Sequence, residues 1–383
     1  MSLRNENRID LSQQTITTPP DKTLILVSVF IVVIGIMSVF SAGSARAIRE
    51  NITPLYYVLR HLIGFLIGVV ACSFIIFKFD YKKLKNLALP FAFFVLFLLI
   101  LTAFTPLGYT AGGATRWLNF GGGIRFQPSE FAKLAVVLCF ANIFSKDIRI
   151  LDSNKYIYYF LFGLILLLVL KQPNLSMALL LLMTTFGIYF CAGGSIKFIL
   201  SSVICAIPVG FLYLRGYQWD RILTWLNPDR DPRGTGYNII QSLIAFAEGG
   251  LIGVGYGNSK QKLSWLPEGH TDFIFSVIAE EFGFIGSVFI VILFLVFIMR
   301  GFLIATRCPD MFGKLLAFGI TFSIGTQALL NMAVASSFIP ATGIPMPFIS
   351  YGSSSLVVTM CMLGILLNIS RKKVRRIMPN GVN

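Results

Sequence analysis

Charged residues are scarce in this chain of 383 residues: Asp, Glu, Lys and Arg make up 13% of it, whereas 56% of the residues are hydrophobic. A soluble domain carries about 25% charged residues, so the composition excludes an ordinary soluble fold. Acidic residues are the rarer sign, with 17 Asp and Glu against 32 Lys and Arg. A local cluster of acidic side chains is therefore a candidate functional site, because ionisable groups are costly near a membrane core.

Histidine and cysteine are also sparse. The two histidines, His61 and His270, form no catalytic triad with any serine by spacing, and the six cysteines are scattered without a CxxC pair. Zinc and redox sites use closely spaced Cys and His ligands. The chain also lacks a P-loop and a GxSxG motif. These absences weigh against metal-dependent and nucleophilic hydrolases.

Long apolar runs fill the chain instead. They come in blocks of about twenty residues, long enough to cross a bilayer core of roughly 30 Å, and they are continuous rather than alternating, which argues against a membrane β-barrel. We therefore predict an all-α polytopic membrane protein of about ten transmembrane helices. The predicted spans are residues 23–45, 57–77, 86–105, 128–145, 156–171, 175–193, 196–214, 271–299, 312–336 and 348–370.

The placement of Lys and Arg orients these spans. With the N-terminus in the cytoplasm, the short cytoplasmic segments are rich in Lys and Arg, as the positive-inside rule requires. We predict a disordered cytoplasmic leader over residues 1–22, a membrane domain over 23–370 and a basic cytoplasmic tail over 371–383. Because loops between the apolar blocks account for the net charge of +15, no nucleic-acid partner is expected.

One connection, residues 215–270 between the seventh and eighth spans, is much longer than the others and lies on the extracytoplasmic side. It contains Trp219, Trp225 and Trp265 and a series of glycines. Connections of this length are uncommon unless they are functional. We expect amphipathic helices here, one of them near residues 239–246, that pack back onto the mouth of the bundle.

The acidic residues gather in the stretch SWLPEGHTDFIFSVIAEE, residues 264–281. Asp272 stands where the eighth span begins, next to Thr271 and close to His270. A short polar residue at this position either caps the helix or takes part in catalysis. From the residue chemistry alone, both interpretations stay open.

Glu280 and Glu281 lie about two helical turns further along the same predicted span. A carboxylate inside a membrane bundle needs a partner. The candidate partners are Lys133 and Arg60, which lie on other predicted spans.

A second candidate site is the glycine-rich connection that leads into the fourth span, GGATRWLNFGGGIRFQPSEFAKL. Arg116 and Arg125 suit a phosphate or pyrophosphate, because a guanidinium offers a bidentate fork. Trp117 could stack on a sugar or mark the membrane interface. Glu130 and Lys133 are three residues apart on one helix face. They form either a structural intrahelical ion pair or a charged pair in a cavity, and the cost of burying charge favours the cavity.

A third candidate is PATGIPMPFISYGSSSL, residues 340–356, where prolines, glycines and serines interrupt the apolar pattern. Non-helical backbone at membrane depth is tolerated only where it lines a cavity or is buried in protein. One interpretation is a tight turn followed by small residues at helix contacts. The other is a polar ligand site that uses hydroxyl groups such as those of Ser350 and Ser354.

Together these motifs resemble the SEDS family (shape, elongation, division and sporulation), which includes FtsW and RodA. The matching pieces run in order over nearly the whole chain: RWLNFGGGIRFQPSEFAKL, KQPNLSMALL, NPDRDPRGTGYNIIQSLIAF, GLIGVGYGNSKQKLSWLPEGHTDFIFSVIAEEFGFIG, QALLNMAV and PATGIPMPFISYGSSS. The details are closer to the FtsW branch, which serves cell division. Thr342 departs from that branch, which usually has a lysine in this string.

The resemblance implies a ten-helix SEDS fold and a peptidoglycan glycosyltransferase that polymerises lipid II. The glycan linked to undecaprenyl pyrophosphate would be transferred to the 4-hydroxyl of GlcNAc on lipid II. The resemblance also implies that Asp272 is the catalytic residue, and a carboxylate there suits a general base. Arg116, Arg125 and Lys133, joined by Arg221 or Arg233, could neutralise the departing pyrophosphate. We assign the substrate site to Arg116, Trp117, Arg125, Glu130, Lys133, His270, Glu281, Ser350 and Ser354.

No dedicated cofactor or metal site is expected, and a divalent cation, Mg²⁺ or Mn²⁺, could assist at the pyrophosphate. The expected partners are lipid II, the nascent glycan strand, a class B penicillin-binding protein transpeptidase and other membrane proteins of the division complex. The expected location is the bacterial cytoplasmic membrane at the division septum, with both termini in the cytoplasm.

Three alternatives to a division polymerase stay open: a RodA-type enzyme of cell elongation, a flippase for lipid II and a scaffold without catalysis. A transporter places its essential charges near the bilayer midplane. Asp272, in contrast, is predicted at the extracytoplasmic mouth. A scaffold would tolerate replacement of Asp272.

Overall fold

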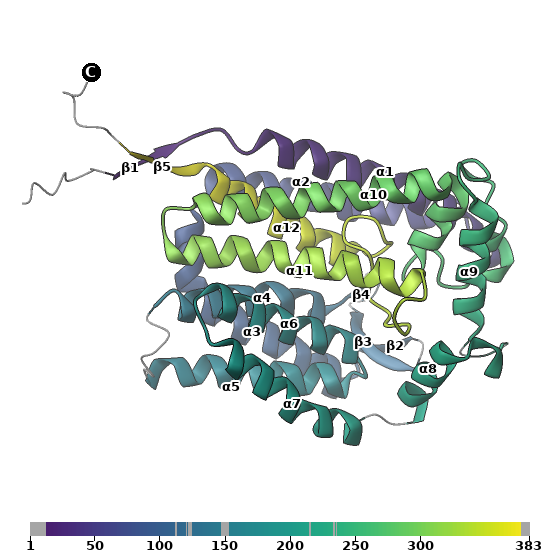
Figure 1. Cartoon of the computed structure of the whole chain (residues 1–383), viewed down its shortest axis with the longest axis horizontal. Coiled ribbons are helices and arrows are strands. Elements are labelled where there is room, and N and C mark those ends of the chain that lie inside the picture. The colour runs from purple at the N-terminus through teal and green to yellow at the C-terminus, as the bar shows by residue number, and fades with distance from the viewer. Residues whose placement is uncertain are drawn as a thin grey trace, which may run out of the picture.

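A computed structural model describes residues 13–376 except 112, 120, 122–124, 147–152, 214, 215, 233 and 235. Its long helices run side by side in one bundle (Figure 1), and the predicted all-α polytopic fold is confirmed. A helix occupies each of the ten predicted positions: α1 (Lys22–Arg49), α2 (Tyr56–Lys78), α3 (Leu84–Phe104), α4 (Pro128–Phe144), α5 (Ser153–Lys171), α6 (Leu175–Cys191), α7 (Ile196–Tyr213), α10 (Ile274–Arg307), α11 (Met311–Ala335) and α12 (Ser353–Ser370).

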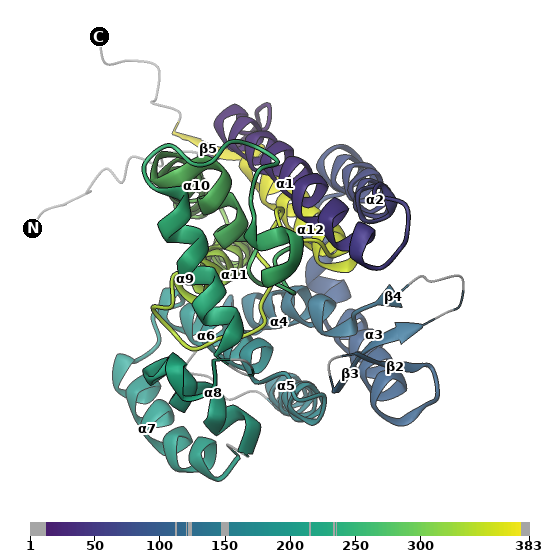
Figure 2. The ribbon, with the colours of Figure 1, turned by 90° about the vertical axis from the view of Figure 1, so that its right-hand side faces the viewer.

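The two ends of the bundle differ (Figures 1 and 2). Both ends of the described chain lie at one end, here called the terminal end, where β1 (Gln13–Thr17) pairs antiparallel with β5 (Lys372–Arg376). The other end is here called the site end. It carries a three-stranded sheet, in the order β2, β3, β4, and the helices of the long connection. These elements are β2 (Gly108–Ala111), β3 (Ala114–Asn119), β4 (Arg125–Phe126), α8 (Gly216–Leu226), η2 (Pro228–Arg230), α9 (Tyr237–Gly249) and η3 (Gln261–Trp265).

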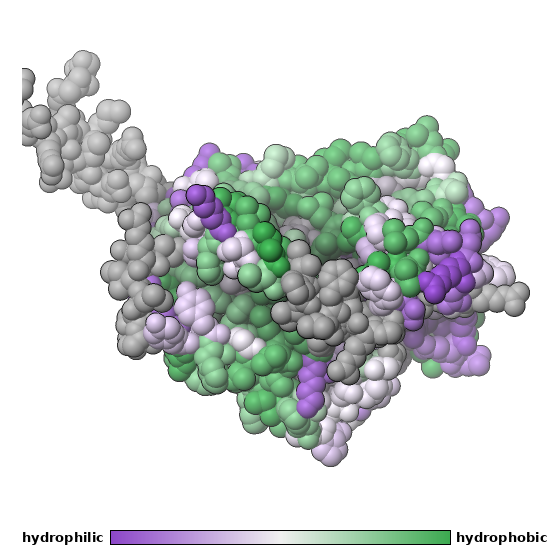
Figure 3. All heavy atoms as spheres, turned by 60° about the horizontal axis from the view of Figure 1, so that its bottom comes forward, coloured by the Kyte–Doolittle hydropathy of each residue, from purple (hydrophilic) through white to green (hydrophobic). Residues whose placement is uncertain are grey.

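The surface of the bundle fits a membrane. Within the described ranges, six helices are long and apolar enough to cross one: α1, α2, α10, α11, α12 and α3 together with η1 (Tyr81–Lys83). Figure 3 shows a broad apolar surface over the helices, with the largest hydrophilic patch gathered at the site end. Exposed apolar side chains are stable in such positions only when lipid covers them.

The strand pair β1–β5 corrects part of the prediction for the tails. We expected disorder up to residue 22, but the chain is already paired from residue 13. The amide of Asp21, which caps α1, donates to Ser370 Oγ at 3.0 Å. The start of α1 and the end of α12 therefore lie together and bring the two flanking segments within pairing distance. The remaining tail residues, 1–12 and 377–383, lie outside the described part of the chain.

The long connection between α7 and α10 folds back onto the site end. It contains helices, as predicted, and α9 coincides with the predicted amphipathic segment at residues 239–246. Arg221 of α8 donates to the carbonyl of Ala341 at 3.2 Å, and Trp225 donates to the carbonyl of Ser337 at 2.9 Å. These bonds attach α8 to the connection between α11 and α12.

Helix α10 is interrupted at Gly283, whose φ of 66° and ψ of −164° lie in a region that only glycine occupies readily. The backbone of residues 249–255 forms hydrogen bonds with the helical groups that the interruption leaves unpaired. In lipid, each unpaired backbone group costs several kcal/mol, so this pairing makes the interruption possible. Four hydrogen bonds of 2.9 to 3.1 Å provide it: Val254 N to Glu280 O, Gly255 N to Glu281 O, Phe284 N to Gly250 O and Ile285 N to Leu251 O.

Replacement of Gly283 by alanine is expected to destabilise the bundle. An added Cβ would lie 2.4 Å from Gly253 N, and the backbone conformation alone costs a residue with a side chain about 1–3 kcal/mol. Gly163→Ala on α5 is the matched control: nothing lies within 4 Å of its added Cβ, so alanine should be neutral or stabilise by up to about 1 kcal/mol. Thermal unfolding in detergent compares the two. Equal melting temperatures for Gly283→Ala and the wild type would contradict the glycine requirement.

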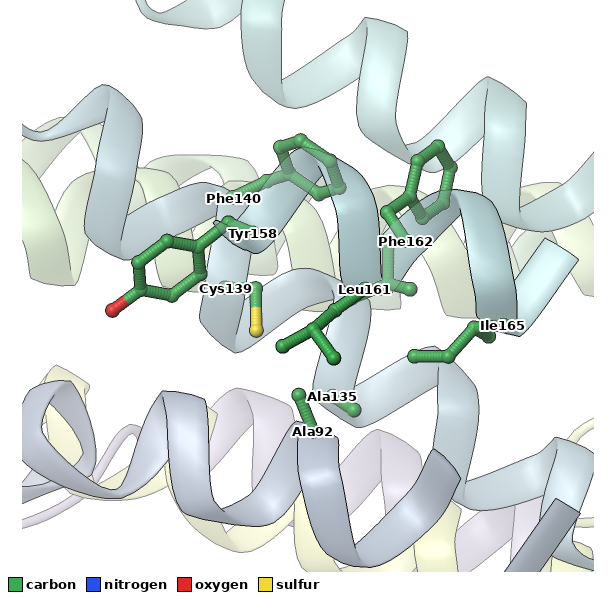
Figure 4. A pocket seen from close by; sticks show the side chains of 9 residues that line it. Ala92, Ala135, Cys139, Phe140, Tyr158, Leu161, Phe162 and Ile165 are labelled. Atoms are coloured by element: carbon green, nitrogen blue, oxygen red, sulfur yellow. The ribbon is translucent and has the colours of Figure 1, made fainter. Parts of the chain in front are cut away.

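A small apolar pocket between α3, α4 and α5 is separate from the predicted site residues (Figure 4). Its polar group is the hydroxyl of Tyr158, which accepts a hydrogen bond from Asn142 Nδ2 at 3.0 Å. The pocket contains no charged side chain and none of the predicted site residues. It is lined by Ala92, Ala135, Val136, Cys139, Phe140, Tyr158, Leu161, Phe162 and Ile165.

Candidate functional site

Asp272 lies on the short segment that leads into α10, at the site end. Three successive backbone carbonyls of this segment accept hydrogen bonds. The donors belong to α11 and to the connection that follows α11. Because all three acceptors are used, the position from which the Asp272 side chain projects is fixed. The three bonds are Tyr351 N to His270 O at 3.0 Å, Ser350 Oγ to Thr271 O at 2.6 Å, and Asn331 Nδ2 to Asp272 O at 2.8 Å.

The carboxylate of Asp272 itself is unengaged. Among the described side chains and amides, none donates a hydrogen bond to it and no cation pairs with it. Gly343 faces it closely, since a Cβ added there would lie 3.4 Å from Asp272 Oδ2. The pKa of Asp272 is raised to about 6: burial and, less strongly, the charge of Glu268 raise it, while Arg116 and Arg221 oppose the rise. A carboxylate that is free and titrates near neutral pH is suited to accept a proton.

The structure excludes helix capping as the role of this segment. The N-cap position of α10 is Phe273, and no side chain bonds to the free amides there. Thr271, the other short polar residue at this position, donates to Glu268 Oε2 at 2.7 Å. Of the two open interpretations, capping fails because the chain makes a further turn, with Phe273 N donating to Glu268 O at 3.1 Å, before the helix begins.

Two guanidinium groups on different elements act electrostatically on Asp272. Arg116 projects from β3, and its Nε donates to the carbonyl of Gln172 at 3.2 Å while its Nη2 donates to the carbonyl of Pro173. Arg221 projects from α8. Both charges act on the pKa of Asp272, so the structure brings together the acid and two of the predicted cations. Arg233, the other candidate in the long connection, lies outside the described residues.

Trp117 and Arg125 belong to the same small sheet as Arg116. Trp117 pairs with Tyr109 of β2, and the Arg125 guanidinium lies 4.0 Å from the centre of the Tyr109 ring. Arg125 is exposed and Trp117 is half-buried. The sheet therefore presents an aromatic side chain and two arginines at the site end.

Glu130 and Lys133 form a buried ion pair on α4, with 2.7 Å between Glu130 Oε2 and Lys133 Nζ. Lys133 also donates to Gln327 Oε1 at 2.6 Å, and Gln327 Nε2 donates to the carbonyl of Pro345 at 2.7 Å. The pair is thus intrahelical, as its spacing allowed, and is also linked to the connection that faces Asp272. Within the described part of the chain, neither oxygen of Glu130 receives a well-directed hydrogen bond.

The predicted partners of the second acidic pair were wrong. Glu281 pairs with Lys262 of η3 at 2.6 Å and also accepts a bond from Ser41 of α1. Glu280 accepts a bond from the amide of Lys260 at 2.6 Å. The sequence analysis proposed cations on other spans. The long connection instead returns along α10, where it supplies the ammonium of Lys262 to Glu281 and the amide of Lys260 to Glu280. Glu281 is buried in this contact and joins η3 to α1 and α10, so the structure does not place it with Asp272.

His270 is buried and faces Arg46 of α1, with 3.1 Å between His270 Nε2 and the Arg46 guanidinium. Burial, together with the charges of Arg46 and Arg49, lowers the pKa of His270 to about 3. The imidazole is therefore neutral at physiological pH and accepts the arginine's hydrogen bond. Arg46 also pairs with Glu50 at 2.7 Å and lies 4.0 Å from Glu268.

The hydroxyls of Ser350 and Ser354 are used within the protein. Ser350 Oγ accepts from Met346 N at 2.7 Å while it donates to the carbonyl of Thr271. Ser354 Oγ accepts from Gln127 N at 3.2 Å. These contacts favour the interpretation in which small polar residues hold the segment together.

Sequence reasoning missed three polar residues that organise the site: Arg46, Gln327 and Asn331. Gln327 and Asn331 could have been noticed, because these two amides lie four residues apart in the apolar string QALLNMAV. Residues at this spacing share one helix face. Among the described side chains, no three His, Cys, Asp or Glu residues gather as metal ligands.

Replacement of Glu268 by glutamine should move the acid limb of the activity profile to lower pH. The negative charge of Glu268 raises the pKa of Asp272, so its removal lowers that pKa and keeps the base ionised in more acidic solution. Glu50→Gln is the control, because Glu50 shares Arg46 with Glu268 but does not raise the pKa of Asp272. The measurement is the maximal rate as a function of pH. Unchanged midpoints in both variants would show that Glu268 does not act on Asp272.

Comparisons with known proteins identify the family of this chain. The family described as "Cell cycle protein", named for FtsW, RodA and SpoVE, matches residues 21–375. The probable peptidoglycan glycosyltransferase FtsW of Geobacter metallireducens is 38% identical over 359 residues, which cover 92% of this chain and 95% of that protein. The stage V sporulation protein E of Bacillus subtilis is 35% identical over 359 residues, covering 92% and 98%.

Solved structures share the fold. A chain from a structure concerned with the structural coordination of polymerization and crosslinking by a peptidoglycan synthase complex superposes with a TM-score of 0.75 at 31% identity, covering 92% of this chain and 98% of that one. The crystal structure of the rod shape determining protein RodA of Thermus thermophilus superposes with a TM-score of 0.68 at 27% identity, covering 92% and 97%.

Proposed function

The chain belongs to the FtsW, RodA and SpoVE family of cell cycle proteins, and on that premise we propose that it is a peptidoglycan glycosyltransferase that polymerises lipid II in cell division. The observation that carries this proposal is the carboxylate of Asp272, at one end of a membrane bundle, to which no described group donates a hydrogen bond and on whose pKa Arg116 and Arg221 act. Relatives named as probable peptidoglycan glycosyltransferase FtsW, at 37 to 40% identity, favour the division branch over the RodA branch.

The geometry supports a general-base mechanism. Asp272 accepts the proton of the GlcNAc 4-hydroxyl of lipid II while that oxygen attacks the anomeric carbon of the growing glycan. The bond from this carbon to undecaprenyl pyrophosphate breaks, and the pyrophosphate leaves with its negative charge. Arg116 and Arg221 stabilise the developing charge, because cations fixed in advance need no reorganisation during the reaction. The lipid tails stay in the bilayer against the apolar surface of the helices.

The decisive experiment uses purified protein and labelled lipid II. Incubation with the partner transpeptidase in detergent or proteoliposomes is expected to produce glycan polymers that separate by length on a gel. Transport of labelled lipid II across the proteoliposome membrane without any polymer would identify a flippase instead. Absence of both activities, with growth unaffected when Asp272 is replaced, would identify a scaffold.

A class B penicillin-binding protein is the proposed partner, supported by the similarity to a structure that concerns a synthase complex for polymerization and crosslinking. The proposed location is the cytoplasmic membrane at the septum. Both termini would then face the cytoplasm and the site end the outside, in agreement with the basic residues at the terminal end. A fluorescent fusion at midcell supports the division role, and a side-wall pattern supports the elongation role. We propose no step through Mg²⁺ or Mn²⁺, because the carboxylates near Asp272 do not form a set of three ligands within the described ranges.

A further inference from the structure

Two buried amide side chains lie one helical turn apart on α11, at the level of the candidate site. Gln327 and Asn331 are each 1% exposed. A primary amide is costly to bury without hydrogen bonds, and more so in a membrane protein. The hydrogen-bond partners of these two amides therefore indicate their role in the structure.

Asn331 joins two segments that are far apart in the sequence. Its Nδ2 donates one hydrogen bond to the carbonyl of Asp272 and the other to the carbonyl of Ile344, both at 2.8 Å. Both carbonyls lie in connections between helices, so neither belongs to a helical hydrogen-bond ladder. One side chain thus supplies the bond that fixes Asp272 and the bond that fixes the segment opposite it.

Gln327 holds the next residue of the same opposite segment. Its Nε2 donates to Pro345 O at 2.7 Å, and its Oε1 accepts from Lys133 Nζ at 2.6 Å. The adjacent carbonyls of Ile344 and Pro345 are therefore both held by α11. Gly343, the residue before them, is the one that faces the Asp272 carboxylate. The two amides consequently fix the position of two backbone segments: the one that carries the Asp272 carboxylate, and the one at residues 343–345 that the carboxylate faces.

We propose that Asn331 is a positioning residue for Asp272, which fixes the direction of the carboxylate without touching the substrate. The proposal rests on the catalytic role of Asp272 in the proposed function. A displacement of about 1 Å in a reacting group lowers a rate by about 10²-fold. Loss of the Asn331 bonds frees the segment 270–272 on the α11 side, where no other bond to the Asp272 carbonyl exists within the described chain.

Two variants test the proposal with purified protein and lipid II. Asn331→Ala removes the side chain, and Asn331→Asp keeps its size but loses both donors. Each is expected to lower kcat by about 10²-fold and to leave KM for lipid II little changed, because Asn331 does not contact the substrate. Rates are normalised to the folded fraction from size-exclusion chromatography, so that a poorly folded variant is still informative.

Asn142→Ala is the matched control. Asn142 is buried on α4 and also donates two bonds through Nδ2, to Lys85 O at 3.2 Å and to the Tyr158 hydroxyl at 3.0 Å. In both asparagines the Oδ1 atom is buried without a hydrogen-bond partner within the described part of the chain. The control variant should lose stability in a similar way but keep the wild-type kcat, since Asn142 has no bond to the Asp272 segment.

The possible failures are distinguishable. If Asp272→Ala polymerises lipid II at the wild-type rate, the proposed function fails and the positioning role fails with it. If Asp272→Ala is inactive while both Asn331 variants keep the wild-type kcat, only the positioning role is overturned. An equal loss of kcat in Asn142→Ala, or a loss that appears in KM alone, would also overturn it.

Discussion

Asp272→Asn is expected to reduce glycan polymerisation from purified lipid II by about 10²- to 10⁴-fold, the contribution of a positioned general base. The amide has nearly the shape of the carboxylate but cannot accept the proton of the attacking hydroxyl. No described side chain bonds to the carboxylate, so the substitution breaks no hydrogen bond or ion pair among the described residues. The reaction is followed by the yield and length of the glycan product.

The same variant has a stability signature. The pKa of Asp272 is raised from 3.8 to about 6 in the folded protein, so the folded state disfavours the charged form. Ionisation of this group therefore costs stability as the pH rises from about 4 to about 6, by a few kcal/mol at most. Asp272→Asn should melt at the same temperature as the wild type near pH 4 and at a higher temperature at pH 7.5.

The control for this prediction is Asp80→Asn, at the turn between α2 and α3 on the terminal end. Asp80 accepts a bond from the amide of Lys82 at 3.0 Å and lies at the opposite end of the bundle from Asp272. Its replacement should leave polymerisation unchanged. Glycan product of normal yield and length from Asp272→Asn would remove Asp272 from the mechanism.

Lys133→Met should lower the free energy of unfolding by about 3–5 kcal/mol, the usual effect of removing one member of a buried ion pair. Glu130 has no exposed surface, so its carboxylate would remain charged without a counter-ion or would have to take up a proton. Gln327 Oε1 would lose its donor as well. Thermal or denaturant unfolding in detergent measures the loss.

A double variant separates the ion pair from simple packing. Glu130→Gln combined with Lys133→Met removes both charges, which is often close to neutral, and should recover most of the lost stability. Lys197→Met, at an exposed position of α7, should change stability by less than about 0.5 kcal/mol. The pair would be unimportant if Lys133→Met were as stable as the wild type, and the loss would be one of packing if the double variant were no better than the single one.

The positions of the long helices could be predicted from the sequence because an apolar block of about twenty residues is a strong and local signal. The interruption of α10 could not. Residues 282–299 form one continuous apolar run, and Gly283 looks like an ordinary helical glycine within it. Its conformation depends on Gly253, which approaches from the long connection, and this contact is visible only in three dimensions.

The candidate site divides in the same way. Asp272 could be found because an acid is conspicuous in a chain with few acids, and Arg116 because it lies in a distinctive glycine-rich string. The partner of Glu281 could not be found, because Lys262 reaches it only through the path of the long connection. Asn331 was overlooked because its four-residue spacing to Gln327 does not indicate a partner, and its two acceptors are backbone atoms that any sequence would provide.

The interrupted helix α10 has a consequence for how the chain is assembled in the cell. As it leaves the ribosome, α10 is not a self-sufficient span, because four of its backbone groups find their partners in residues 250–255. These residues are translated before α10, so the missing partners are already present when the helix enters the bilayer. The order of synthesis thus matches the order in which the bonds are needed, and an insertion that displaced residues 250–255 would leave those four groups facing lipid.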